Sequence, residues 1–436
     1  MFKNVILGIF IAGALLAMAM FAGIIKIGGK STSTTVVKGT AVMWGTFSFQ
    51  SMQPLLSDFK DVNGDINIQY VEKNPATFSS DITESIAAGN PPDLILMPDN
   101  LIKHFKDQIV HIPFTSIPAD TYTNTFISAA NIFVANDGIV ALPWAADPMI
   151  LYYNRDMLQS AGYAKPPAKW QDFTDSIKLL TIKQNDMTIT QNAAALGTYS
   201  NIAHAKDIIA LLFLQTGNPF MTYDYSHFTA YLGGGGTTNE RDIANQVMAF
   251  YTAFSNPVKA VYSWNAGEPL DRDLFEQSSL AYYFGSASEL PAIRAKNPNL
   301  NFGIALPPQS PTGTIVTTGR IFGIAIPKSA KNQLLSFTAA SLLTNSAAEA
   351  SLSGNSAVTL ALLPVRRDVL SGKQVSDQYL NFLYKTVIVQ KSWFDPDPIV
   401  SDKILGGAIR DINSSLMTID EALGKAETQL EATGNQ

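Results

Sequence analysis

Aromatic and carboxylate side chains stand at predicted strand ends, where they could hold a sugar-like molecule. An indole ring stacks on the apolar face of a sugar, and a carboxylate accepts hydrogen bonds from its hydroxyls. The candidate tryptophans in loops or at strand ends are Trp44, Trp144, Trp264 and Trp393, and the candidate carboxylates are Asp99, Asp147, Asp395 and Asp397. An alternative stays open, because a loop tryptophan can cover the core and an aspartate beside proline can form a turn.

No catalytic motif accompanies these residues. The histidines His104, His111, His204 and His227 lack a metal-binding spacing, and no serine has a nucleophile-elbow context. The glycine run at residues 233–236 lacks the lysine of a phosphate loop and predicts a surface loop. We therefore expect binding without catalysis, cofactor or metal, although two carboxylates of a glycoside hydrolase stay open as an alternative.

Length and composition limit the class of protein. A chain of 436 residues is too long for one ordinary core, so two domains are expected. The formal charge of -6 and the pI near 5.3 argue against a nucleic-acid partner. The chain has no cysteine, which removes disulfides, thiolate metal sites and lipid attachment through a lipobox.

The N-terminus carries an uncharged apolar run at residues 5–25, between Lys3 and Lys26. As a helix it would measure about 31 Å, enough to cross the hydrocarbon core of a membrane. Residues 1–27 are therefore a transmembrane anchor or a signal segment, with Ala17 and Ala19 as candidate cleavage residues. We favour the anchor, because cleavage there would leave an apolar stub. Residues 28–38, rich in Gly, Ser and Thr, predict a flexible tether.

Strands and helices alternate after the tether, which predicts an α/β fold with a mostly parallel sheet. Strands are expected at residues 41–47, 66–71 and 93–97, with helices at 54–59 and 78–86 between them. Ligands of open α/β sheets lie beyond the carboxyl ends of the strands. Trp44 and Asp99 are therefore expected to face the same crevice.

The stretch from Gly138 to Thr181 is the most informative. Apolar runs at 139–143 and 149–153 predict two strands, interrupted at Trp144, Asp147 and Pro148. Trp170, with apolar residues at helical spacing after it, is predicted to be a packing residue of a helix.

This stretch resembles family 1 of the extracellular solute-binding proteins of ABC transporters. Members carry a segment like G-x-x-x-x-L-P, then D, then L-Y-Y-N-x-D-x-L, then G, then P-P-x-x-W-x-x-F. The matching residues here are Gly138, Leu142, Pro143, Asp147, 151–154, Asp156, Leu158, Gly162, Pro166, Pro167, Trp170 and Phe173. Further similar stretches are 280–329, 362–370 and 418–430.

The resemblance implies a two-lobed periplasmic-binding-protein fold of type II, with a sheet flanked by helices in each lobe. Crossings between the lobes are expected near residues 146–148, 302–306 and 343–346. Lobe one would then be 39–146 with 306–344, and lobe two 147–305 with 345–436. Hinge crossovers allow the lobes to close on a ligand.

The resemblance also implies a site and partners. Candidate ligand contacts are Trp44, Phe47, Asp99, Trp144, Asp147, Trp264, Phe284, Ser286, Gly319, Arg320, Trp393 and Asp395. The chain departs from the maltose-binding pattern after Gly285, where Ser286, Ala287 and Ser288 replace an aromatic, so a stacking platform is absent or is supplied by Trp264.

The expected function is a monomeric receptor that delivers a sugar or oligosaccharide to ABC permease subunits, at the extracytoplasmic face of the membrane or, after cleavage, secreted or periplasmic. One alternative is a tethered sensor or surface glycan-capture protein without transport. Another is a receptor for a cationic ligand such as a polyamine, because the candidate site contains more Asp than Lys or Arg.

Overall fold

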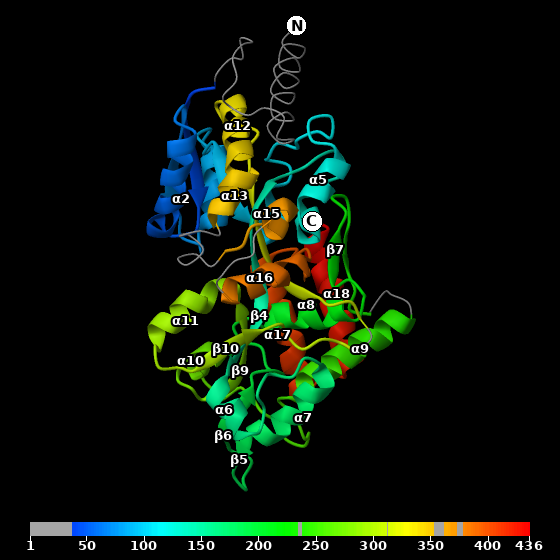
Figure 1. The fold of residues 1–436 in the computed structure, drawn as a ribbon. Coiled ribbons are helices and arrows are strands. Elements are labelled where there is room, and N and C mark those ends of the chain that lie inside the picture. Colours follow the sequence, from blue (N-terminus) through cyan, green and yellow to red (C-terminus); the bar gives the residue numbers. More distant parts are fainter. Residues whose placement is uncertain (1–36, 234–237, 312, 353–361, 373–377) are drawn as a thin grey trace. The chain divides into compact units, whose positions relative to one another are not determined.

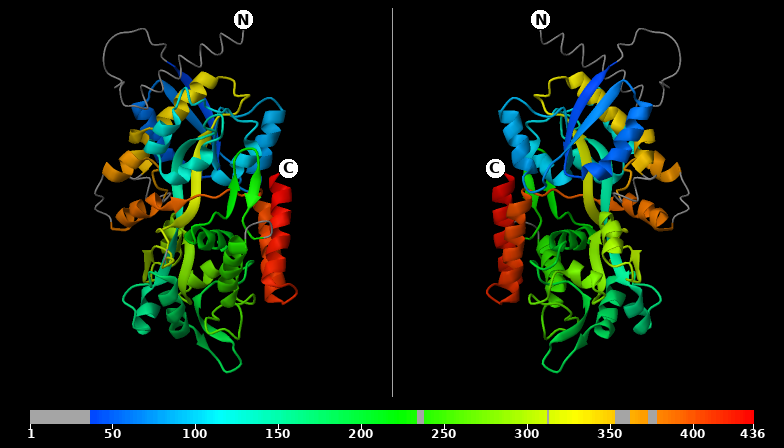
Figure 2. Two further views of the ribbon diagram at one scale, coloured as in Figure 1. Left: turned by 90° about the vertical axis from the view of Figure 1, so that its right-hand side faces the viewer. Right: turned by 90° about the vertical axis from the view of Figure 1, so that its left-hand side faces the viewer.

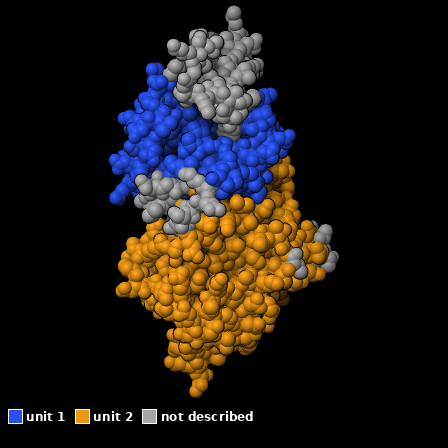
Figure 3. All heavy atoms as spheres, in the orientation of Figure 1, with its two compact units in different colours: residues 1–146, 320–374 blue, residues 147–319, 375–436 orange. Residues whose placement is uncertain are grey.

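A computed structural model of the chain describes residues 37–233, 238–311, 313–352, 362–372 and 378–436. The chain forms two compact units, each built from separate stretches of sequence (Figure 3). Unit 1 is Met1–Ala146 with Arg320–Gln374, and unit 2 is Asp147–Gly319 with Val375–Gln436. The chain passes from one unit to the other within strand β4 (Leu142–Asn154), within strand β11 (Thr317–Ala325) and at 374–375.

The unit boundaries agree with one predicted crossing and differ from the other two. The boundary at Ala146 and Asp147 lies in the predicted interval 146–148. The interval 302–306 is instead inside unit 2, because β10 (Phe302–Ala305) pairs with the unit 2 part of β4. The interval 343–346 is inside unit 1, because the helix that follows it, α13 (Ser346–Leu352), packs on α2 (Phe49–Val62). Residues 306–319 therefore belong to unit 2, and 345–374 to unit 1.

Unit 1 contains a sheet in the order β2, β1, β3, β11. Its helices α2 and α13 are labelled in Figure 1. Strand β1 (Gly39–Gly45) is parallel to β2 (Ile66–Glu72) and to β3 (Leu94–Pro98), whereas β11 is antiparallel to β3. The expected parallel sheet is thus present here with one antiparallel strand. Its other helices are α3 (Phe78–Ala87), η1 (Asp99–Leu101), α4 (Ile102–Phe105), α5 (Ala119–Thr125), η2 (Ser128–Phe133), α12 (Gln333–Leu343) and α15 (Arg367–Gly372).

Helix α2 shows how the sequence builds unit 1. It starts at the N-cap Ser48, whose side chain accepts a hydrogen bond from the Ser51 amide. Met52, Leu55 and Phe59 recur at helical spacing and are buried, which forms the apolar stripe that covers the sheet. The helix starts before the predicted interval 54–59, because the cap at Ser48 and the buried Met52 precede it, and the helix continues to Val62.

Unit 2 has a mixed sheet. Strand β9 (Leu280–Ser286) pairs antiparallel with β4 and parallel with β6 (Ile189–Ala194), and β10 pairs antiparallel with β4. Two short strands extend it, β5 (Ile182–Lys183) beside β6 and β12 (Gln390–Lys391) beside β11. The hairpin of β7 (Met221–Tyr223) and β8 (Phe228–Ala230) forms a separate two-stranded sheet. The helices are α6 (Arg155–Ser160), α7 (Trp170–Leu180), α8 (Ala205–Gln215), α9 (Thr238–Ala253), α10 (Asp271–Glu276), η3 (Ala287–Glu289), α11 (Leu290–Lys296), α16 (Gln378–Ile388), α17 (Pro398–Asn413) and α18 (Ile419–Gly434).

Strand β4 corrects the prediction of two strands with a break. It is one continuous strand of 13 residues that includes Trp144, Asp147 and Pro148. Proline has no amide hydrogen for a ladder. Ala146 exchanges backbone hydrogen bonds with Leu363, and the pairing of β4 with β9 starts at Met149, opposite Ser286. Neither of these two pairings uses Pro148. Asp147 therefore lies within a strand and not in a loop.

Helices α17 and α18 form a C-terminal hairpin (red in Figure 2), and its turn confirms the predicted capping box. The Thr418 hydroxyl accepts from the Glu421 amide, and the Glu421 carboxylate accepts from the Thr418 amide. We expect Thr418→Ala to lower the free energy of unfolding by about 1 kcal/mol. Urea denaturation would measure this loss. An unchanged midpoint would show that the cap contributes nothing to global stability.

Three predicted segments lie wholly or mostly outside the described residues: the apolar run at 5–25, the tether at 28–38 and the glycine loop at 233–236. Within the described part of the chain, we find no helix with the length and apolar character required to span a membrane.

Candidate ligand site

The carboxylate of Asp147 is held by a single serine in unit 2. Its Oδ1 accepts a hydrogen bond from the Ser288 amide at 2.9 Å, and its Oδ2 accepts one from the Ser288 hydroxyl at 2.6 Å. Burial raises the pKa of Asp147 to about 6, although these two hydrogen bonds act in the opposite direction. The nearby Glu289 carboxylate raises the pKa further. A carboxylate oxygen can accept two hydrogen bonds, so Asp147 can accept one more on each oxygen.

Gly319 of β11 lies directly against the backbone at Asp147. A Cβ atom added at Gly319 would lie 2.3 Å from the Asp147 carbonyl oxygen and 2.6 Å from the Cα of Pro148. Two residues earlier, the Thr317 hydroxyl donates to the Met149 carbonyl at 2.7 Å. The absence of a side chain at Gly319 therefore permits the close approach of the two strands at Asp147.

Ser288 lies in a short turn, residues 286–289, between β9 and α11. The Ser286 amide donates to Oε1 of Glu289 at 2.9 Å, which completes a capping box. The Tyr152 hydroxyl of β4 donates to the Ser286 carbonyl at 2.7 Å. Asp147, Ser286, Ser288 and Gly319 thus lie together in unit 2, and we refer to these four residues as the Asp147 site.

Unit 1 brings together a second group of the predicted contacts. Arg320 forms an ion pair with Asp99, with 3.7 Å between Nη1 and Oδ1. The Phe47 ring packs edge-on against Phe322 at a centroid distance of 4.8 Å and lies 6.0 Å from the ring of Trp144. Asp99 is in the first turn of η1, directly beyond β3, as the sequence predicts.

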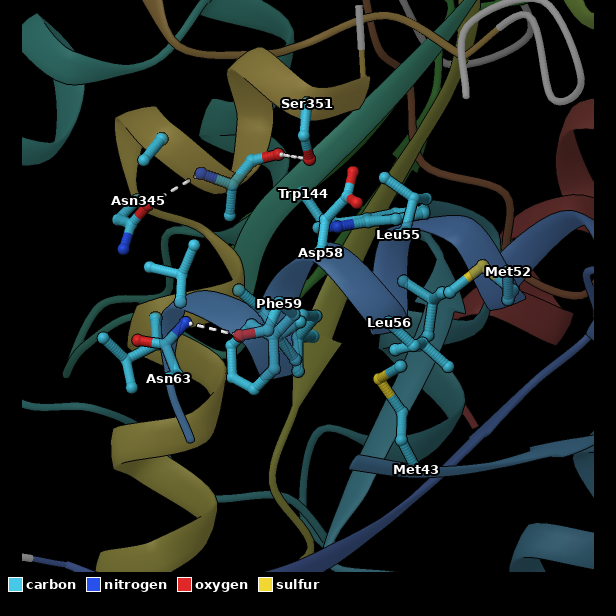
Figure 4. A pocket seen from close by; sticks show the side chains of 17 residues that line it. Met43, Met52, Leu55, Leu56, Asp58, Phe59, Asn63, Trp144, Asn345 and Ser351 are labelled. Atoms are coloured by element: carbon cyan, nitrogen blue, oxygen red, sulfur yellow. Dashed lines mark hydrogen bonds between the residues drawn. The ribbon is translucent and has the colours of Figure 1, made fainter. Parts of the chain in front are cut away.

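Trp144 borders an apolar pocket of unit 1 with a cavity volume of about 90 Å³ (Figure 4). Met52, Leu55 and Phe59 of α2 line it, together with Met43 of β1. Successive side chains of a strand point to opposite faces. Trp44 therefore faces away from this pocket.

Trp44 has an internal partner on its own face. The Lys73 ammonium lies 3.7 Å from the centroid of its ring and also forms an ion pair with Asp81 at 3.1 Å. Trp44 and Trp144 were both predicted as ligand contacts, but Trp44 does not line the pocket that Trp144 borders. The reason is the alternation of side chains along β1.

Four predicted contacts are in the core of unit 2 instead of at an accessible ligand surface. Trp264 has 0% and Phe284 2% of its surface exposed, and the Phe284 ring stacks on Trp170. Trp393 packs against Phe220 with 5.2 Å between ring centroids. Asp395 is buried in an ion pair with Lys206 at 2.7 Å. These side chains already have partners or lie in packed surroundings. Asp147 is also buried, with 6% of its surface exposed, but its carboxylate oxygens keep free acceptor positions.

Asp397 and Trp170 both have structural roles in unit 2. Asp397 caps the N-terminus of α17 by accepting from the amides of Ile399 and Val400. Trp170 is buried as a packing residue, as predicted, and its indole donates to Gln215 at 2.6 Å.

Ser288, Glu289 and His204 were not among the predicted ligand contacts. The pattern Ser286-Ala-Ser-Glu289 is a capping-box sequence and could have indicated the turn. His204 is 85 residues from its partner Glu289, and no local sequence pattern indicates that pairing.

Solved structures with the same fold include several solute-binding proteins. The cyclic alpha-maltosyl-1,6-maltose binding protein of Arthrobacter globiformis superimposes with a TM-score of 0.73 at 17% identity, over 92% of this chain and 100% of that one. An ABC transporter solute-binding protein of Thermotoga lettingae bound to alpha-D-tagatose gives 0.68 at 18% identity, over 91% and 100%. UgpB of Mycobacterium tuberculosis in complex with glycerophosphocholine gives 0.69 at 17% identity, over 91% and 99%. The fold is therefore that of the type II periplasmic binding proteins.

Sequence comparison identifies the family. The family model described as bacterial extracellular solute-binding protein matches residues 55–381, and the chain belongs to this family. Binding proteins of Brucella abortus (strain 2308) and Brucella suis biovar 1 are 24% identical over 260 residues. That alignment covers 58% of this chain and 58% of each relative.

Proposed function

We propose that this protein binds a carbohydrate-like solute outside the cytoplasm and delivers it to the permease of an ABC importer. The observation that carries the proposal is the Asp147 carboxylate, which Ser288 orients through both oxygens. Each oxygen can accept one more hydrogen bond, so the pair fits two neighbouring hydroxyls of a sugar ring. Asp147 lies at the matched family position, in the strand that passes between the units.

The ligands of proteins with the same fold support this class of solute. The Arthrobacter globiformis protein binds a cyclic maltosaccharide, and the Thermotoga lettingae protein holds tagatose. The Mycobacterium tuberculosis protein holds glycerophosphocholine, whose glycerol hydroxyls are also hydrogen-bond donors. A polyol fragment is common to these ligands, and it is the part that Asp147 would recognise.

The proposal includes the location and the mode of action. Residues 5–25 would anchor the protein to the outer face of the membrane, and a monomer would bind solute without any catalysis. Closure of the two lobes on the solute would be the signal that the permease reads. Small-angle X-ray scattering with and without bound sugar would test closure, since closing reduces the radius of gyration.

A thermal-shift screen tests the ligand class. Binding to the native state raises Tm by mass action. We expect one or more of tagatose, mannotriose and acarbose to raise Tm, and spermidine to leave it unchanged. A shift with spermidine alone, weakened by salt, would replace the sugar with a cationic ligand. If a sugar raises Tm but the sugar-loaded protein stimulates no permease, the result would instead favour sensing or surface glycan capture.

Sugar affinity should fall in acid, because the acceptor form of Asp147 is the ionised one. The pKa of Asp147 is raised to about 6, so the carboxylate is ionised at pH 7.5 and mostly protonated at pH 5. If only the ionised form binds, affinity for mannotriose should be about tenfold lower at pH 5 than at pH 7.5. Isothermal titration calorimetry at the two pH values measures this ratio.

The matched control for this pH dependence is Asp147→Asn, whose residual affinity should not change with pH at this position. Asp271 also has its pKa raised to about 6, mainly by burial, but it bonds the Ala203 amide and not the Asp147 site. Any pH dependence that survives in Asp147→Asn would therefore come from groups such as Asp271. Equal affinity of the native protein at both pH values would argue against Asp147 as a ligand acceptor.

A further inference from the structure

Behind the Asp147 site, Glu289 accepts contacts from four different groups. Its Oε1 lies 2.6 Å from Nε2 of His204 and accepts from the Ser286 amide at 2.9 Å. Its Oε2 accepts from the Tyr283 hydroxyl at 2.6 Å and lies 3.3 Å from Nη1 of Arg272. A carboxylate offers about four acceptor positions, so Glu289 is saturated by this set.

His204 is the cation at the centre of this network. Burial alone would lower its pKa, but its contacts with Asp207 and Glu289 outweigh burial and raise the pKa to about 10. Asp207 lies 3.9 Å from Nδ1 of His204, on the opposite side of the ring from Glu289. The pKa of Glu289 is lowered although burial opposes this, because His204 and Tyr283 donate to it. Both groups are therefore charged at neutral pH.

We propose that the His204–Glu289 ion pair is a positioning element for solute binding: it fixes the turn of residues 286–289, and through Ser288 it fixes the orientation of the Asp147 carboxylate. This rests on the proposed role of Asp147 as the solute acceptor. The connection is short in sequence and in space. Glu289 holds the first amide of the turn, and Ser288, its direct neighbour, supplies both donors to Asp147.

The two donors from Ser288 explain why small displacements of the turn matter. Both come from one residue and reach different oxygens of one carboxylate, so a rotation of the turn weakens both hydrogen bonds together. Positioning within a few tenths of an ångström is what a preorganised binding group requires. A loosened turn would leave Asp147 in several orientations, and affinity would fall without loss of the carboxylate itself.

A second ion pair of the same network provides a matched control. Arg272 donates from Nε to Oε1 of Glu276 at 2.9 Å, and Glu276 is buried, with 8% of its surface exposed. Glu276 thus shares a cation with Glu289, but its own contacts are with Arg272 and with the side chain of Asn297, outside the 286–289 turn. Glu276→Gln should lower stability through the lost ion pair and leave the turn in place.

The test compares Glu289→Gln, His204→Gln and Glu276→Gln in the full-length protein. The first readout needs no solute: hydrogen–deuterium exchange, by mass spectrometry, of the peptide that contains the Ser288 amide. We expect this amide to exchange at least about tenfold faster in Glu289→Gln and His204→Gln, because its hydrogen bond to Asp147 opens more often. Exchange in Glu276→Gln should stay within about twofold of the native rate.

The second readout is affinity for mannotriose by isothermal titration calorimetry. Glu289→Gln should weaken binding by about tenfold or more, whereas the same change in a Ser288→Ala background should add less than about twofold, since the path to Asp147 is already broken. A purely structural role would lower Tm in every variant and leave the effects on affinity additive.

Each outcome decides the proposal. Native exchange at Ser288 in both Glu289→Gln and His204→Gln would overturn it, as would equal acceleration in Glu276→Gln. If Glu289→Gln does not fold, His204→Gln retains a hydrogen-bonding side chain and carries the test. If the native protein binds neither mannotriose nor acarbose, the proposed solute class is wrong, and the exchange data alone decide whether the ion pair positions the turn.

Discussion

Asp147→Ala is expected to abolish the thermal shift with sugar and to weaken affinity at least about 100-fold. A hydrogen bond to a charged group contributes about 1.5–3 kcal/mol, and Asp147 can accept one from each of two hydroxyls. The loss should therefore exceed that of a typical contact residue. Isothermal titration calorimetry with mannotriose measures it directly. Unchanged affinity would remove Asp147 from the site.

The apo protein should stay folded in these variants. Folding raises the pKa of Asp147 to about 6. Protonated Asp147 therefore stabilises the native state below the pKa of the unfolded chain, and this stabilisation is lost as the pH rises through about 6. At pH 7.5 the ionised Asp147 therefore destabilises the fold. Asp147→Asn removes that charge and keeps an acceptor for Ser288, so its Tm should equal or exceed that of the native protein while its affinity for sugar is weakened.

Asp395→Asn is the matched control for this experiment. Asp395 is also a buried aspartate of unit 2, but its carboxylate pairs with Lys206 and accepts from the Ser401 hydroxyl at 2.7 Å. Loss of its charge leaves Lys206 with a weakened partner, so Tm should fall. Affinity for sugar should stay native. The two aspartates would then show opposite effects, one on binding and the other on stability.

Local patterns predicted much of the fold, because alternation and capping act over short spans. The alternation of strand and helix up to residue 97 and the capping box at Thr418 are present in the structure. The break predicted at Pro148 is absent, because partner strands decide whether a missing amide hydrogen costs a hydrogen bond. The sequence cannot show which positions the partners leave unpaired.

The candidate site was less predictable, because its contacts join distant residues. Asp147 was found from its place at a strand boundary and from the family pattern, but its partner Ser288 is 141 residues away. Lys206, which neutralises Asp395, is 189 residues away from it. Trp264 and Trp144 carried the same local signal, and both are buried, but Trp144 borders a pocket whereas Trp264 has 0% of its surface exposed. A tryptophan between predicted elements can be enclosed in the core or border a pocket, and the tertiary packing decides which.

Gly319→Ala is expected to affect stability and binding together. The new methyl carbon would lie 2.3 Å from the Asp147 carbonyl oxygen, far inside van der Waals contact, and the atoms that it meets belong to backbone. Relief requires β4 and β11 to separate at Asp147. Overpacking of this kind costs about 1–3 kcal/mol, and we expect the upper part of that range because the backbone has little freedom to move.

Strand separation at Gly319 should also displace Asp147 from Ser288 and weaken sugar binding more than the stability loss alone explains. Gly407→Ala is the matched control, since Gly407 lies in α17 of the same unit, and the nearest atom to an added Cβ is Nη2 of Arg410 at 3.8 Å. Alanine at that helical position should leave affinity native and raise stability by about 0.5–1 kcal/mol. Thermal denaturation and titration with mannotriose measure both effects. Native Tm and affinity in Gly319→Ala would show that the site does not require glycine at this position.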